Sequence, residues 1–487
     1  MARYSLGRLH SVISRAALAA ALSLAIVCLS LGPRVANGQG GGGGAGGGGA
    51  GGGTIGTGAT SGVAVDASGV LQRVMIPDPT GALSRQRAQE AMARLNGDIA
   101  KPSKLRKVSL TRLERLMNQR LAEGQSIDDA MRHLAGITRL QYVFCYPESG
   151  DIVIAGPAEA WGEAPSGRML GIQTGRPVLE LQDLVVALRA FPPGANRDKP
   201  FIYCSIDPTP EGLTRMQDFL RAYGSSPRAF HDTQFIVNNL QQSLGLQVIT
   251  VGGVSPKTHF AQVLVEADYR MKLIGIGLED PPVRLRSYVD RANPAQIARN
   301  ALQRWYFMPE YQCVKVSEDA MAMQLVGDGV KLVGENEVVG KDGKRVVTSN
   351  GNSASDAFVR AFTQVYPQLA ERAPVYAQLR NCIDMAVAAA FIQHQEYYEA
   401  VGWKADTFLS EQAYPVETLN PPTQVETAVN ALMKGNTLLT PVGGGVQMRP
   451  TVALASENLM GDEDKAIAKA RAEVNLSSLR ADQWWWD

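Results

Sequence analysis

The chain has 487 residues, of which 48 are lysine or arginine and 47 are aspartate or glutamate, so its formal net charge is +1. A nearly balanced charge provides no basic field for phosphate groups, which disfavours nucleic acid as a partner. The hydrophobic content of 45% is typical of a folded globular chain. The length is sufficient for about two or three domains.

The first 38 residues have the three parts of a secretory signal. Three arginines without an acidic residue come first, an uncharged stretch of 17 residues at 16–32 follows, and small residues stand at Ala36 and Gly38. We therefore predict an exported protein that is cleaved after Gly38 and is periplasmic, envelope-associated or extracellular. The alternative is an uncleaved anchor, although a spanning helix needs about 20 apolar residues. After cleavage the net charge becomes −3, because the leader carries four arginines, and we expect no integral membrane protein.

A glycine-rich segment follows the leader. Residues 40–62 hold 15 of the 49 glycines of the chain. Glycine loses more backbone entropy on ordering than any other residue and has no side chain to bury in return. We therefore predict a flexible linker at 39–62. The rest of the chain is divided into an N-terminal helical and β-hairpin region at 63–165, a central region at 166–430, and a C-terminal loop, charged helix and tryptophan tail at 431–487.

Within the region 63–165, the segment 82–140 reads mostly as helix. Two strands, 140–146 and 151–155, then flank a Pro-Glu-Ser-Gly turn, which predicts a β-hairpin. The stretch 101–120 holds seven basic residues and one acidic residue. We interpret it as a solvated helix face; contact with an acidic polymer or a lipid head group is the alternative.

The central region alternates strand and helix, which predicts an α/β layer. Strands are expected at 201–206 and 247–251, helices at 210–223 and 230–244, and a longer helix after Ser255-Pro256. On this last helix Glu266 faces Arg270 and Asp268 faces Lys272 at a spacing of four residues, which predicts ion pairs on its solvent side.

After residue 294 the hydrophobic period changes to two. Short antiparallel strands are expected between 305 and 347, with a hairpin turn at Lys-Asp-Gly-Lys. Two long helices, 354–371 and 374–400, follow. The predicted fold class is thus α+β, with an α/β-layered central region followed by an antiparallel strand region and two long helices.

Several strings in the central and C-terminal parts are distinctive: Ser-Ile-Asp-Pro-Thr-Pro-Glu-Gly-Leu at 205–213, Glu-Ala-Asp-Tyr-Arg-Met-Lys at 266–272, Asn-Ala-Leu-Met-Lys-Gly-Asn from 430 and Thr-Pro-Val-Gly-Gly-Gly-Val up to 446. With these strings the chain resembles, over about 150–450, a family of exported planctomycete proteins catalogued only as a domain of unknown function. The resemblance implies a source group and a compartment. It implies no mechanism and no catalytic residues.

The sequence contains no complete set of residues for a known catalytic or cofactor site. The strand–turn–helix junction at 252–258 is placed like a phosphate-binding loop, but Pro256 stands where that loop needs its last glycine. No two histidines have metal-ligand spacing on one helix. We therefore predict neither a cofactor nor a metal ion.

Weak candidates for an active site lie near the ends of the central strands and helices. They are Asp207, His231, His259, Asp268 and Arg270. In α/β folds, ligands often bind where strands end. The alternative is structural: Asp207 caps the helix that begins at 210, and Asp268 and Arg270 belong to surface ion pairs.

Four cysteines remain beyond the leader: Cys145, Cys204, Cys313 and Cys382. An oxidising compartment would permit two disulfides, in one of three pairings. Their apolar neighbours favour buried, reduced thiols instead.

The chain ends in Trp484, Trp485, Trp486 and Asp487. The tryptophans either form an exposed anchor for an envelope protein or polymer, or dock back onto the folded body. The leading functional hypothesis is a non-enzymatic, envelope-associated binding or scaffolding protein. An exported hydrolase of unrecognised type is the alternative.

Overall fold

The computed structural model describes residues 60–195, 201–223, 233–292, 301–339, 345–347, 352–430, 442–474 and 476–487. All of them belong to one compact unit, Gly53–Asp487. The predicted leader at 1–38 lies outside the described residues, as does the linker except for residues 60–62, which begin the first strand.

The elements have the following bounds. The strands are β1 (Thr60–Val65), β2 (Val70–Ile76), β3 (Ser103–Ser109), β4 (Tyr142–Tyr146), β5 (Asp151–Ala158), β6 (Trp161–Glu163), β7 (Met169–Gly171), β8 (Ile202–Asp207), β9 (Leu246–Gly252), β10 (Ala301–Pro309), β11 (Val314–Val316), β12 (Ala322–Leu325), β13 (Val330–Val339), β14 (Arg345–Val347), β15 (Gln424–Glu426), β16 (Val442–Met448), β17 (Leu459–Gly461) and β18 (Trp485–Trp486). The α-helices are α1 (Ala82–Arg94), α2 (Leu110–Ala122), α3 (Asp129–Arg132), α4 (Leu181–Ala190), α5 (Pro210–Tyr223), α6 (Thr233–Leu244), α7 (His259–Gly275), α8 (Tyr288–Arg291), α9 (Ser353–Arg372), α10 (Pro374–His394), α11 (Tyr397–Ala400), α12 (Asp406–Leu409) and α13 (Ala466–Ala472). Short 3₁₀ turns are η1 (Leu134–Gly136), η4 (Pro450–Leu454) and η5 (Leu476–Ser478).

The larger sheet has nine strands in the order β1-β2-β15-β9-β8-β16-β10-β13-β14. Its neighbours pair antiparallel except for β15 with β2 and β10 with β16. On β8 the side chains alternate between buried Ile202, Cys204 and Ile206 and half-buried Tyr203, Ser205 and Asp207. This alternation shows that one face of the sheet is packed against the core.

The smaller sheet has seven strands in the order β17-β11-β12-β4-β5-β3-β18. The predicted hairpin is its centre, with β4 and β5 antiparallel from Tyr142–Ala155 to Tyr146–Asp151. All of β4 except Tyr142 is buried. Strands β6 and β7 form a separate hairpin.

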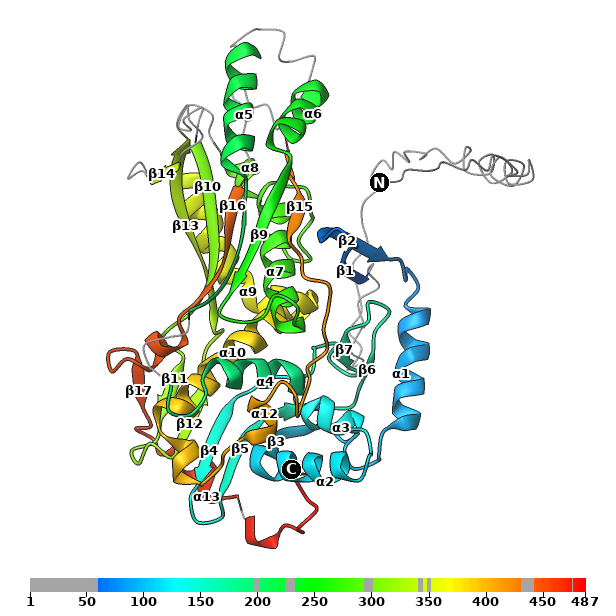
Figure 1. The fold of residues 1–487 in the computed structure, drawn as a ribbon, viewed down its shortest axis with the longest axis vertical. Coiled ribbons are helices and arrows are strands. Elements are labelled where there is room, and N and C mark those ends of the chain that lie inside the picture. The colour runs from blue at the N-terminus through cyan, green and yellow to red at the C-terminus, as the bar shows by residue number, and fades with distance from the viewer. Residues whose placement is uncertain are drawn as a thin grey trace, which may run out of the picture. The chain divides into compact units, whose positions relative to one another are not determined.

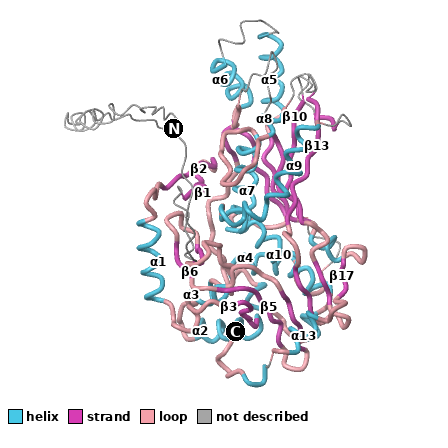
Figure 2. Tube along the Cα trace, turned by 180° about the vertical axis from the view of Figure 1, so that it is seen from behind, coloured by secondary structure: helices cyan, strands magenta, loops and turns pink. Residues whose placement is uncertain are grey.

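Helix α10 lies at the centre of the core. Every residue from Val375 to Gln393 is buried, as expected for a helix that is apolar around most of its circumference. Figures 1 and 2 both show α10 and α4 between the strands of the larger sheet and those of the smaller one. No helix in the described part of the chain is long and apolar enough to cross a membrane.

The predicted fold class is confirmed, since two mixed sheets combine with long helices in an α+β arrangement. The two predicted long helices are α9 and α10, and Pro374 begins the second. A proline fits there because the first helical N–H has no partner within the helix.

Two local predictions were wrong. The basic stretch 101–120 is not one helix face, because β3 occupies 103–109 and Arg106 is completely buried. The ion pairs of α7 are not on the surface: Asp268 is 0% exposed and Arg270 is 8% exposed. The pairing followed from the spacing. Helix α7 packs on β8, β16 and α10, and this packing covers Asp268 and Arg270.

The tryptophan tail docks back onto the body. Strand β18 pairs antiparallel with β3, and Trp484 is buried. The guanidinium of Arg106 lies 4.7 Å from the ring centre of Trp485 and donates to both carboxylate oxygens of Asp487. Of the two predicted alternatives for the tail, the structure shows docking.

Candidate functional site

A cavity of about 770 Å³ opens beside the first turn of α7. Its ionisable lining, apart from a tyrosine, comes from segments far apart in the sequence: Arg132, His133, Arg168, Glu180, His259, Glu266 and Glu417. The volume is in the range of sites for small molecules. This cavity is the place in the fold where a predicted candidate, His259, faces a space that can hold a ligand.

Two helix starts position the central side chains. His259 is the first residue of α7, whose capping residue Thr258 accepts a hydrogen bond from the Ala261 amide at 3.2 Å. Glu180 is the capping residue of α4, and Asp183 lies in the first turn of that helix. The positive ends of helix dipoles favour acidic side chains at such positions. The dipole of α4 therefore favours the charged form of both carboxylates, and burial opposes it.

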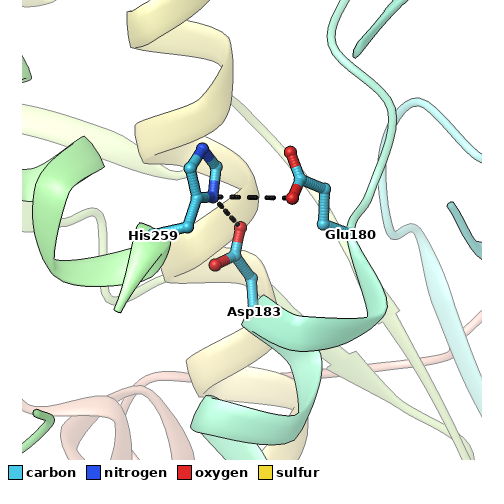
Figure 3. Close-up of side chains that lie close together, drawn as sticks. All are labelled: Glu180, Asp183 and His259. Carbon is cyan, nitrogen blue, oxygen red and sulfur yellow. Dashed lines mark hydrogen bonds and ion pairs between the residues drawn. The ribbon is translucent and has the colours of Figure 1, made fainter. Parts of the chain in front are cut away.

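The three side chains point toward one another (Figure 3). The Nδ1 atom of His259 lies 2.8 Å from Oδ2 of Asp183 and 3.8 Å from Oε2 of Glu180. A carboxylate oxygen accepts, so Nδ1 donates to Asp183. Glu180 also accepts from Nε2 of Gln182 at 2.6 Å. The second ring nitrogen of His259 points away from both carboxylates.

The electrostatics of the group favour a protonated histidine. Burial by itself would lower the pKa of His259, but the charges of Asp183 and Glu180 outweigh burial and raise this pKa to about 10. Burial raises the pKa of Asp183, although His259 acts in the opposite direction. Burial also disfavours the charged form of Glu180, but His259 and the hydrogen bond from Gln182 lower the pKa of this carboxyl. The charges of Asp183 and Glu180 thus favour the protonated form of His259, in which both ring nitrogens are hydrogen-bond donors.

A row of side chains with alternating charges begins at the cavity and continues away from it. Arg168 contacts both carboxylate oxygens of Glu266. Arg270 lies 3.5 Å from Glu266 and 2.7 Å from Glu279, and Arg73 reaches Glu279 at 3.2 Å. Each acidic residue in this row therefore lies between two guanidinium groups, and the charge of Arg168 is compensated before any ligand enters.

Of the other predicted candidates, the structure describes Asp207, Asp268 and Arg270, and it does not unite these three with His259. Asp207 lies at the end of β8, where its carboxylate accepts from Arg304 Nη2 at 3.2 Å. The two side chains meet above Gly443 of the intervening strand β16, where an added Cβ would lie 3.0 Å from Asp207 Oδ1. The helix that begins at 210 is capped by Thr209, whose hydroxyl accepts from the Gly212 amide at 3.0 Å, so the capping role predicted for Asp207 was wrong.

Asp268 and Arg270 are buried members of ion pairs, and neither lines the cavity. Lys272 Nζ donates to Asp268 Oδ2 at 2.8 Å and to the Ile206 carbonyl oxygen at 3.1 Å. These contacts assign both candidates to the packing of α7. His231 lies outside the described residues.

Sequence reasoning missed Glu180 and Asp183. The only local signal is an acidic residue directly before an apolar run, Leu184 to Leu188, which is typical of a helix start. Nothing in that signal points to His259, which is 76 positions from Asp183. The contact exists only because α4 and α7 pack together.

The four described cysteines are free and buried. Burial raises the pKa of Cys145 and of Cys313 to about 12. Thiols of this kind are poor nucleophiles because the thiolate is the reactive form. The structure thus shows the buried, reduced alternative.

Comparison with known proteins gives one partial match. A family described as a protein of unknown function (DUF1598) matches residues 204–288. No curated protein and no solved structure shows a significant match to the chain. The predicted resemblance to a domain of unknown function is confirmed for this stretch, which is shorter than the predicted 150–450. It contains His259 but neither Glu180 nor Asp183, and it brings no chemistry with it.

Proposed function

We propose that this chain is an exported, envelope-associated protein that binds a polar ligand in the cavity beside His259 and performs no catalysis there. The observation that carries the proposal is the place of His259 beside that cavity, where the carboxylates of Asp183 and Glu180 lie against its ring and favour the protonated form. A protonated imidazole donates hydrogen bonds but cannot accept a proton. Such a residue suits recognition of a ligand better than general base catalysis.

The ligand class follows from the lining. The cavity presents donors from Arg132 and His259 and acceptors from Glu180 and Glu417. Charges of both signs favour a ligand that carries both donors and acceptors and little net charge. A short saccharide of the cell envelope has this chemistry, and we propose it as the ligand.

The compartment and the source rest on the sequence alone. The leader at 1–38 supports export, and the strings at 205–213 and 266–272 support a planctomycete source. Cell fractionation followed by N-terminal sequencing tests export. We expect an envelope or extracellular chain that begins at Gln39, and a cytoplasmic chain that begins at Met1 or Ala2 would contradict the proposal.

Saturation-transfer NMR with soluble oligosaccharides released from purified envelopes tests ligand binding. Gln262 lines the cavity and is half-buried, whereas Gln86 is an exposed glutamine on α1. The variant Gln262→Leu is expected to lose at least tenfold in affinity, and the matched control Gln86→Leu is expected to bind like the wild type. Equal binding by the two variants, or no binding by the wild type, would exclude this cavity.

An exported hydrolase remains the second candidate, because the Asp183–His259 hydrogen bond is the arrangement that orients a catalytic histidine. A catalytic triad would also need a nucleophile, and no hydrogen bond joins His259 to a serine, threonine or cysteine of the described segments. Assays with ester and glycoside substrates test this candidate. If the wild type hydrolyses a substrate and a folded His259→Gln variant does not, the hydrolase is supported and the binding proposal is contradicted.

A second contact surface is proposed at the carboxyl end. Strand β18 is an edge strand of the smaller sheet, and Trp485 and Trp486 are half-buried there. Edge strands with aromatic side chains can accept an additional strand from a partner. A pull-down from envelope fractions with Trp486→Ser tests whether an envelope protein or polymer binds here, and retention of every wild-type partner would contradict it.

A further inference from the structure

We propose that Glu180, Asp183 and His259 form a binding site for a divalent transition-metal ion of the Zn²⁺ class. One donor atom from each of the three residues lies within 4.8 Å of the other two. An imidazole with two carboxylates is a donor set that Zn²⁺ accepts in proteins. The inference goes beyond the proposed saccharide binding, because the ion alone is the ligand.

The distances between the donor atoms suit insertion of an ion. Tetrahedral ligands at about 2.0–2.2 Å from Zn²⁺ lie about 3.3–3.6 Å from one another. The present separations from His259 Nδ1 are 2.8 Å to Asp183 and 3.8 Å to Glu180, one shorter and one longer than this range. Movements of about half an ångström, within the reach of side-chain torsions, would produce the ligand geometry.

The charges of the group also leave room for a cation. Two carboxylates face one histidine, and the nearby guanidinium of Arg168 is already occupied by Glu266. Asp183 is only 4% exposed, and its Oδ1 atom accepts no hydrogen bond of normal geometry. A buried acceptor without a partner is unfavourable. An ion that replaces the Nδ1 proton, which passes to solvent, would match the two negative charges of Glu180 and Asp183.

The ion can reach the group from solvent, because Glu180 and His259 line the cavity. The same wall contains His133, whose Nδ1 bonds to the Asp129 carbonyl oxygen at 2.8 Å. His133 does not belong to the three-residue group. It therefore provides a matched control, a histidine of the same cavity whose loss leaves the proposed ligands in place.

Isothermal titration calorimetry of the metal-free mature chain with Zn²⁺ alone tests the inference, with bound zinc counted by elemental analysis after dialysis. We expect one equivalent with micromolar or tighter affinity in the wild type and in His133→Gln, and at least tenfold weaker binding in His259→Gln and Asp183→Asn. Glu180→Gln replaces the more accessible carboxylate and serves if the other variants fail to fold, as judged by circular dichroism.

Absence of zinc binding in the wild type would overturn the inference, and so would equal binding by the wild type and by every folded variant among His259→Gln, Asp183→Asn and Glu180→Gln. Loss of binding in His133→Gln would overturn the three-residue assignment. Zinc binding without saccharide binding would refute the proposed function and leave this inference standing. Saccharide binding without zinc binding would refute this inference and leave the proposed function standing.

Discussion

Helix α7 carries charged side chains in two settings. In its middle, Asp268 faces Lys272 at 2.8 Å, and the two side chains are 0% and 5% exposed. At its first residue, His259 faces the two carboxylates of Glu180 and Asp183 beside a cavity. Asp183 and Asp268 each retain one oxygen without a hydrogen-bond partner, so an unsatisfied atom alone does not distinguish the two settings.

The number of charges and the access to solvent do distinguish them. The middle of α7 matches one acid with one base and is sealed between β8 and α10. The start of α7 has two acids for one base and opens to a cavity of about 770 Å³. Buried charges in equal number are explained by packing, whereas an excess of one sign at a cavity suggests a ligand.

The largest expected effect comes from breaking the matched pair. In Lys272→Met the carboxylate of Asp268 stays buried without its partner, and we expect a loss of about 3–5 kcal/mol in the free energy of unfolding. Urea denaturation measures the loss. The double variant Asp268→Asn/Lys272→Met should recover most of it, because it leaves no buried charge. If Lys272→Met is as stable as the wild type, the Asp268–Lys272 pair is not buried away from water.

The pH dependence of stability tests the same pair. Burial raises the pKa of Asp268 from 3.8 to about 6, despite the opposing charge of Lys272. The folded state then holds the proton more firmly than the unfolded state, so this group lowers stability as the pH rises from about 4 to about 6, on the order of 3 kcal/mol in total. We expect the difference in unfolding free energy between the wild type and Asp268→Asn to shift by this amount over that interval. A constant difference from pH 4 to pH 7 would contradict the raised pKa.

A smaller effect is expected at the docked tail. The side chain of Arg106 is 0% exposed and its salt-bridge partner Asp487 is 44% exposed. The carbonyl oxygens of Ile99, Lys101 and Ala135 accept the remaining hydrogen bonds of Arg106. In Asp487→Ala the guanidinium of Arg106 keeps these hydrogen bonds but loses its counterion. We therefore expect a loss of about 2–3 kcal/mol in the free energy of unfolding. Thermal unfolding measures it, and Asp482→Ala is the exposed control. An unchanged melting temperature would mean that the tail is not anchored by this pair.

The smallest effect is expected where a matched pair is exposed. Arg480 and Asp482 lie 3.1 Å apart, with side chains 78% and 70% exposed. Water screens such a pair, so Arg480→Ala should change the free energy of unfolding by less than about 0.5 kcal/mol. A larger change in the free energy of unfolding, measured by urea denaturation, would show that burial does not determine how much these ion pairs contribute to stability.

Much of the fold could be predicted where the signal is local. The hairpin at 140–155 and the helices α9 and α10 follow from hydrophobic periodicity, which repeats within a few residues. Pro374 marks the start of α10. Strand β16 could not be predicted in this way. Its residues Gly443, Gly444 and Gly445 read as a loop, yet β16 pairs with β8 on one side and β10 on the other.

The reason for these glycines is tertiary. A Cβ at Gly444 would lie 1.8 Å from the Trp305 carbonyl oxygen, and one at Gly445 would lie 1.9 Å from that of Cys204. Only residues without a side chain let β16 lie between these two strands. That requirement depends on neighbours more than 130 positions away, which a local pattern does not contain.

By itself, the sequence determined the α+β class, the two long helices, the β4–β5 hairpin, the central strands β8 and β9, and the pairing of Asp268 with Lys272 four residues apart. Export is its expectation. Only the tertiary structure decided that this pair is buried, that the tryptophan tail docks on β3, and that His259 meets Glu180 and Asp183. The physical reason is the range of the interactions. Hydrogen bonding along a helix and side-chain periodicity act within a few residues, whereas burial and the charge around a side chain are set by whichever distant segments pack against it.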